Sequence, residues 1–184
     1  VTVARDVQKQ RPGEAVGYAL EGDIAASRKA WAEAASVYRT GLKQAPATEL
    51  AIKLNAALTA GGSAAEAEKF AASWLKDHPK DIAFRLALGD LALARKDYAT
   101  ASQQYQQILN LQPKNALVLN NLAWTAARQK DAKAIDYAEK ANELAPNQPA
   151  FMDTLAELLA EKGDTARALT LQKKAVELAP QAEN

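Results

Sequence analysis

The stretch that decides the fold is residues 82–113, which read IAFRLALGDLALARKDYATASQQYQQILNLQP. It holds two apolar segments, Ile82–Arg95 and Tyr98–Leu111, with a two-residue break between them and Pro113 after the second. Apolar residues recur three or four positions apart in both segments, which is the period of an amphipathic helix and not of a strand. Proline ends the second segment because it has no N–H and clashes with the preceding turn. The stretch therefore predicts two helices joined by a short turn.

The same pattern returns along the whole chain every 33 or 34 residues. Six of the seven prolines share one phase, at Pro12, Pro46, Pro79, Pro113, Pro146 and Pro180. An alanine precedes each of the last five by 12 residues, at Ala34, Ala67, Ala101, Ala134 and Ala168. A repeat of this length indicates stacked two-helix units, none of which can bury its apolar face alone. We therefore predict an all-helical (all-α) solenoid without strands.

The proline phase also predicts the organisation of the chain, as a single array over residues 1–184. Residues 1–12 correspond to the tail of a truncated repeat, and five helix-turn-helix repeats follow at 15–47, 48–81, 82–115, 116–148 and 149–182. Because the chain begins with Val1 and a broken unit, we interpret it as part of a longer array whose targeting signal would lie upstream.

Composition excludes several classes of function. The 184 residues carry a net charge of +1, so no excess charge attracts nucleic acid or an anionic membrane. There is no Cys and one His, which excludes thiol chemistry and argues against a zinc site. No apolar run is long enough to span a bilayer. Nucleotide-binding, metalloprotease and serine-hydrolase motifs are also missing, so we expect no enzyme, cofactor or metal.

The single histidine and two of the three tryptophans favour structural roles. His78 precedes Pro79 at the end of a predicted helix, where it can cap carbonyl groups and interact with the helix dipole. A catalytic base at this position would have no nucleophile motif beside it. Trp31 and Trp74 fall at positions that favour packing between helices.

The repeat resembles the tetratricopeptide repeat (TPR), whose pattern is most complete in residues 82–115. The matching residues are Leu88, Gly89, Tyr98, Ala101, Tyr105 and Pro113. Two departures stand out, because Asn55 occupies a position usually held by a small residue and Glu21 one usually held by leucine. The resemblance implies a right-handed α-α superhelix, a solenoid of helix pairs that binds protein or peptide partners in a concave groove lined by its first helices.

The same resemblance assigns the residues that face the groove. In the last three repeats they form a candidate partner-binding surface of Leu86, Asp90, Leu93, Leu117, Asn120, Trp124, Arg128, Asp153, Glu157 and Glu161. An aromatic ring beside an amide, an arginine and acids is typical of a binding patch. Alternative interpretations stay open: Trp124 packed between helices, Asn120 in a helix contact, and the acids as a solvated or base-binding stripe. The equivalent positions Ile52, Ala56, Leu86 and Asp90 lack the lysines and asparagines of a co-chaperone carboxylate clamp.

A narrower resemblance covers most of the chain and involves four segments in a fixed order. They are Gly17-Tyr18-Ala-Leu-Glu-Gly22-Asp23, Trp74-Leu75-Lys-Asp-His78-Pro79-Lys-Asp81, Leu119-Asn120-Asn121-Leu122-Ala123-Trp124 and Asp153-Thr154-Leu155. This order is similar to the C-terminal part of the PEP-CTERM-system TPR-repeat lipoproteins, also called PrsT. One departure is Ala156-Glu157, where that family tends to have Gly-Trp. The resemblance implies a periplasmic scaffold in an exosortase and exopolysaccharide system, anchored as an outer-membrane lipoprotein.

Together these features predict a non-catalytic protein-protein interaction scaffold. The alternative is a structural or assembly protein that associates end to end through its repeats. Val176 and Leu178 lie near the end of the last predicted helix, with only four residues after Pro180 and no polar capping helix. Terminal repeats usually need a polar outer face, so apolar residues there favour self-association.

Overall fold

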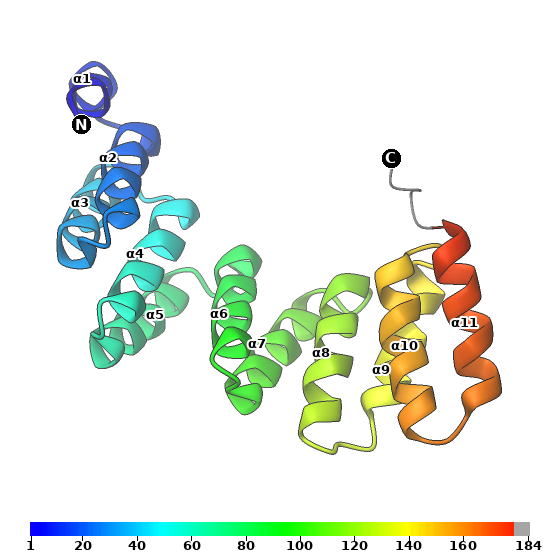
Figure 1. Ribbon diagram of the computed structural model, residues 1–184. Helices are drawn as coiled ribbons and strands as arrows, with labels where there is room; N and C mark the ends of the chain where they lie inside the picture. The colour runs from blue at the N-terminus through cyan, green and yellow to red at the C-terminus, as the bar shows by residue number, and fades with distance from the viewer. Residues whose placement is uncertain (179–184) are drawn as a thin grey trace. The chain divides into compact units, whose positions relative to one another are not determined.

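The computed structural model describes residues 1–178, and in that range the chain forms eleven α-helices and no strand (Figure 1). They are α1 (Thr2–Gln10), α2 (Ala15–Ser27), α3 (Trp31–Gln44), α4 (Thr48–Ala60), α5 (Ala64–Asp77), α6 (Ile82–Ala94), α7 (Tyr98–Leu111), α8 (Ala116–Arg128), α9 (Ala134–Leu144), α10 (Pro149–Glu161) and α11 (Thr165–Leu178). The prediction of five helix pairs after a partial helix is confirmed. The end of the predicted fifth repeat, 179–182 with Pro180, lies outside the described residues.

The helices form two compact units, Val1–Ala87 and Leu88–Asn184. In the first unit α1 packs on α2, α2 on α3, α3 on α4 and α4 on α5. In the second, α7 packs on α8, α8 on α9, α9 on α10 and α10 on α11. Helix α6 continues from one unit into the other. Within α1–α5 and within α7–α11, consecutive helices thus pack on one another, as stacked repeats require.

The in-phase alanines let the helices approach closely. All five are buried: Ala34, Ala67, Ala101, Ala134 and Ala168. Larger side chains fill the space between them, such as Leu50 and Leu54 in the first unit and Leu155 and Leu159 in the second. Close packing of this kind explains why so small a residue recurs at a fixed phase.

Two tyrosines fill space that a missing side chain leaves on the preceding helix. A Cβ atom on Gly22 would overlap the Tyr38 ring, and one on Gly89 would lie 2.6 Å from the Tyr105 ring. In the other three repeats the first-helix residue has a side chain, and the residue in the tyrosine position is alanine or glutamine. These pairs are Asn55 and Ala71, Ala123 and Ala138, and Ala156 and Gln172. A tyrosine ring therefore occurs in the second helix only in the two repeats whose first helix has glycine at this position.

The turn inside each repeat closes in the same way. Each turn contains one residue with a left-handed backbone, and in chain order these are Lys29, Gly62, Lys96, Lys130 and Gly163. The next residue donates its N–H to a carbonyl five residues back, as Asp97 does to Ala92 at 2.9 Å. This is the Schellman closure, which satisfies carbonyl groups at a helix end and reverses the chain. It fixes how each second helix returns along its first helix.

The two departures from the repeat pattern are polar residues with partners. Glu21 is buried, and its carboxylate accepts hydrogen bonds from Arg5 Nε and Gln8 Nε2, each at 2.7 Å. Burial alone would raise the pKa of Glu21, but these donors hold it below its usual value. The buried Asn55 amide donates to the Ala67 carbonyl at 2.9 Å. Glu21 thus ties α1 to α2, and Asn55 ties α4 to α5.

No helix within residues 1–178 combines the length and the apolar character needed to cross a membrane.

Candidate functional site

An aromatic and charged cluster lies in the second unit and is called the Trp124 patch below; it consists of Tyr98, Trp124, Arg128 and Glu157. The Arg128 guanidinium carbon lies 4.5 Å from the centre of the Trp124 ring. Its Nη2 atom lies 3.3 Å from Glu157 Oε1. The Tyr98 ring meets Trp124 edge to face, with centroids 5.9 Å apart. Helices α7, α8 and α10 therefore contribute to one cluster.

Helix α8 positions the centre of the patch. Its first turn is capped by Asn115, whose side-chain oxygen accepts from the Val118 N–H at 3.1 Å. Trp124 and Arg128 are four residues apart, so they lie on one face of the helix. Gln129, the next residue, donates to the Tyr98 carbonyl at 3.2 Å and fixes the end of α8 against the start of α7. The helix that carries Trp124 and Arg128 is thus fixed at both of its ends.

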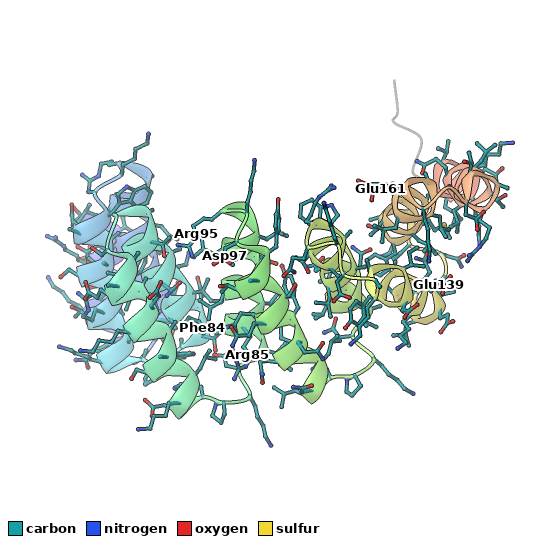
Figure 2. The ribbon with its side chains drawn as sticks, turned by 90° about the horizontal axis from the view of Figure 1, so that it is seen from below. Phe84, Arg85, Arg95, Asp97, Glu139 and Glu161 are labelled. Atoms are coloured by element: carbon teal, nitrogen blue, oxygen red, sulfur yellow. The ribbon has the colours of Figure 1, made fainter. Side chains whose placement is uncertain are left out.

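Helix α10 carries three acidic side chains near the Trp124 patch. Asp153, Glu157 and Glu161 are exposed and spaced by four residues, so they form a stripe along one helix face. Among the described residues, only Glu157 of the three has an ion pair. Figure 2 shows Glu161 on α10 and Glu139 on α9. The Glu139 carboxylate binds Arg167 of α11 at 2.9 Å and so belongs to a different contact.

Asp90 is a second acidic position, on α6. Its carboxylate accepts a hydrogen bond of 2.7 Å from the hydroxyl of Tyr105, which is fully buried as a residue. Burial raises the pKa of that hydroxyl, and the adjacent carboxylate raises it further. Asp90 itself is exposed, so one side of the carboxylate stays available to a partner.

Of the ten predicted surface residues, the structure brings Trp124, Arg128 and Glu157 into direct contact. Leu93 and Asn120 are half-buried, and Leu117 is 48% exposed. The Asn120 side-chain oxygen is enclosed without a hydrogen-bond partner among the described residues. Six other residues of the set lie in the second unit. Among the described residues, they form no ion pair, cation–π or ring contact with the Trp124 patch: Asp90, Leu93, Leu117, Asn120, Asp153 and Glu161. Leu86 lies in the first unit and is half-buried.

The sequence missed two features of this surface. Tyr98 was placed only as part of the repeat pattern, although its ring forms one wall of the Trp124 patch. In the first unit, Lys53 Nζ lies 2.9 Å from both oxygens of Asp23 and 3.7 Å from Glu49. The repeat phase places these side chains on neighbouring first helices. The repeat phase does not predict that Lys53 pairs with Asp23 and Glu49, and only the structure shows it.

A cleft of about 530 Å³ opens between α10 and α11. Its lining residues are Asp153, Ala156, Glu157, Ala160, Thr165, Ala168, Leu169 and Gln172. Two apolar side chains of α11 are exposed, Leu169 of the cleft lining at 55% and Val176 at 69%. Glu157 therefore faces both the cleft and the Trp124 patch.

His78 takes part in a packing cluster of the first unit. Its ring lies 4.1 Å from the Trp74 ring, and Trp74 Nε1 donates to Asp81 at 2.9 Å. Thr48 also donates to this carboxylate, at 2.8 Å. Among the described residues, no group of three or more His, Asp or Glu side chains gathers as a metal site would require.

The helix pairs, their Schellman turns and the in-phase alanines define a helical-repeat fold, a solenoid of stacked helix pairs. Residues 151–182, which include most of α10 and all of α11, match the family model described as tetratricopeptide repeat. The TPR repeat-containing protein PA4667 of Pseudomonas aeruginosa is 28% identical over 111 residues. That match covers 59% of this chain and 19% of PA4667, so the chain spans about a fifth of its relative.

Solved structures with the same fold include several of MamA. MamA 41-end from Desulfovibrio magneticus RS-1 is similar with a TM-score of 0.70 at 20% identity, over 92% of this chain and 97% of that one. The structure titled MamA MSR-1 C2 has a TM-score of 0.63 at 23% identity, over 89% and 95% of the two chains. At this identity the likeness shows a shared fold.

Proposed function

We propose that the chain is a non-catalytic scaffold that binds a peptide or helix of another protein across the first helices of its second unit. The Trp124 patch is the observation that carries the proposal. An aromatic ring stacked with an arginine and flanked by a second aromatic is the composition of an interface hot spot. The exposed part of the half-buried Trp124 ring offers apolar area, and Arg128 and the acids beside it offer directed polar contacts.

The cellular setting that we propose is the bacterial envelope. The four ordered segments shared with PEP-CTERM-system lipoproteins support a periplasmic, lipid-anchored scaffold in an exosortase and exopolysaccharide system. The sequence upstream of Val1 in the gene tests this directly. We expect a signal peptide with a lipobox cysteine, and exosortase genes nearby. A cytoplasmic protein without either would contradict the envelope setting and leave the binding surface untouched.

A double variant, Trp124→Ala with Arg128→Ala, tests the binding surface. We expect it to fold with an unchanged helical circular dichroism spectrum and to lose the partners that the wild type pulls down from a periplasmic extract. Arg39→Ala is a matched control, because Arg39 pairs with Glu66 at 2.6 Å between two second helices, away from the first-helix surface. If the double variant captures the same partners as wild type, the surface is not the binding site.

A second candidate function is assembly through end-to-end association of the chain. The exposed Leu169 and Val176 on α11 favour it, because packed repeats cover the equivalent faces of earlier second helices. Leu178, the last residue of α11, is 41% exposed. At the opposite end Val3 of α1 is 74% exposed.

Sedimentation velocity across a hundredfold concentration range tests the assembly role. A polymerising chain would sediment faster as concentration rises, and Val176→Lys would return it to a single slow species. A monomer at the highest concentration would contradict this function. It would leave the partner-binding proposal standing, because the two surfaces use different helices.

A further inference from the structure

The first and second units contain the same three-residue arrangement two repeats apart, with one difference. In both, an aspartate on a first helix accepts a hydrogen bond of 2.7 Å from a tyrosine of the following helix: Asp23 from Tyr38, and Asp90 from Tyr105. The glycine before each aspartate lets the tyrosine ring lie flat against the helix. Each tyrosine hydroxyl therefore orients the carboxylate of its own unit in the same way.

The difference is the residue that the next first helix supplies. In the first unit it is Lys53, whose ammonium group lies 2.9 Å from both oxygens of Asp23. The equivalent residue in the second unit is Asn121, whose amide interacts with the Tyr105 hydroxyl. No lysine or arginine of residues 88–178 forms an ion pair with Asp90. Asp23 is thus neutralised by a lysine of its own unit, and Asp90 has no such partner within residues 88–178.

We propose that Asp90 binds the ammonium group of a lysine side chain of the partner, at the place that Lys53 takes beside Asp23. This inference rests on the proposed function and names the chemistry of the ligand. The Asp23 arrangement serves as its template, because it shows that an ammonium group fits a carboxylate oriented by a tyrosine hydroxyl on this scaffold. An ammonium group carries three donors and suits a single exposed carboxylate.

The residues around Asp90 suit the aliphatic stem of a lysine. Leu93 lies on the same helix one turn from Asp90, and the half-exposed Leu117 lies one turn before Asn121. In the first unit the position of Leu117 is held by Glu49, which gives Lys53 a second acidic neighbour at 3.7 Å. The second unit therefore offers one carboxylate with apolar flanks, which is the environment that lysine side chains cover with their methylene groups.

The same strip of α8 connects this site with the Trp124 patch. Asn121 and Trp124 are three residues apart and share a helix face. Farther along, Asp153 and Glu161 add negative charge that no ion pair among the described residues neutralises. A partner segment that places a lysine at Asp90 and an apolar residue at Trp124 meets a surface of complementary charge.

Binding of displayed peptides tests the inference on the full chain. A random dodecapeptide library is selected on the wild type, and the best lysine-bearing peptide is then titrated by fluorescence anisotropy. We expect Asp90→Asn to weaken its binding about tenfold, the loss expected for one charge-assisted contact. Asn121→Lys should weaken it as much, because the introduced ammonium pairs with Asp90 inside the chain. Asp23→Asn is the matched control and should bind as wild type does.

The peptide supplies the second half of the test. Replacing its lysine with methionine should cause the same loss on the wild type and no further loss on Asp90→Asn. Equal binding of the lysine peptide to wild type and Asp90→Asn would overturn the inference. If Trp124→Ala with Arg128→Ala abolishes binding in that case, the proposed function survives alone. If the wild type selects no peptide, both proposals fail.

Discussion

The arrangements around Asp23 and Asp90 separate what the fold needs from what it leaves available for binding. Both units need the glycine and the tyrosine, because the ring occupies the space where a Cβ atom would lie. Both use the tyrosine hydroxyl to orient an aspartate on the first-helix surface. Only the first unit then neutralises that aspartate with its own lysine. The comparison shows that packing residues recur with the repeat, whereas surface charge is set separately in each unit.

The largest expected effect concerns the packing half of the comparison. Gly22→Ala forces a methyl group into the Tyr38 ring and should lower the free energy of unfolding by about 2 kcal/mol, as overpacking does. Gly89→Ala should cost less, since its added carbon would lie 2.6 Å from the Tyr105 ring. Urea unfolding measures both. Gly13→Ala, with no atom within 4 Å of the added carbon, is the control. Stabilisation by Gly22→Ala would show that the rings do not depend on the missing side chain.

The next effect concerns the tyrosine–aspartate hydrogen bond that occurs once in each unit. Tyr105→Phe keeps the ring and removes the donor to Asp90, so it should lower the free energy of unfolding by about 1 kcal/mol. A double-mutant cycle with Asp90→Asn isolates the bond, because the loss from Tyr105→Phe should shrink when the charged acceptor is absent. An unchanged loss would assign it to altered packing of the ring.

An effect of similar size, which depends on pH, distinguishes the junctions before α6 and α8. Asp81 accepts from the Phe84 N–H at 2.9 Å, as Asn115 does from Val118 at 3.1 Å, but only Asp81 can ionise. Burial by itself raises the pKa of Asp81; donors from Phe84, Trp74 and Thr48 bring it below its usual value. Ionised Asp81 thus stabilises the fold at pH values above its pKa in the unfolded chain. This contribution is lost as the pH falls through its lower pKa in the folded chain.

Asp81→Asn tests that sign. The variant should unfold about 1 kcal/mol more easily than wild type at neutral pH, since an amide accepts weaker hydrogen bonds than a carboxylate. The gap should close as the pH falls below about 4, the ordinary range for aspartate. Urea unfolding at a series of pH values measures it. Asn115→Asp is the reciprocal variant and should introduce an acid-sensitive contribution at α8. A gap that does not vary with pH would contradict the role of ionisation.

The sequence predicted the helix pairs because their determinants are local. Prolines, alanines and the two-residue breaks recur at a fixed phase, and each acts within a few residues of its own position. The same phase placed Trp124, Arg128 and Glu157 on first helices, and the structure brings these three together. Their common binding role stays a prediction.

What the sequence did not reveal depends on side-chain conformation. Glu21 looked like a defect in the repeat, yet it accepts two hydrogen bonds from α1 that no pattern encodes. Lys53 reaches Asp23 across 30 residues. Long side chains such as lysine choose among many rotamers, so their pairing depends on the surface that surrounds them.

The smallest expected effect concerns that pairing and returns to the difference between the units. Lys53→Met removes an exposed ion pair and should cost about 0.5 kcal/mol, because solvent screens the attraction and ordering the lysine stem offsets it. Asn121→Lys should bring a gain of similar size in the second unit, and both changes should fade in molar sodium chloride. Urea unfolding at low and high salt measures both. A gain that persists in high salt would mean that the introduced stem packs on Leu117, and that contact with carbon, not charge, distinguishes the two units.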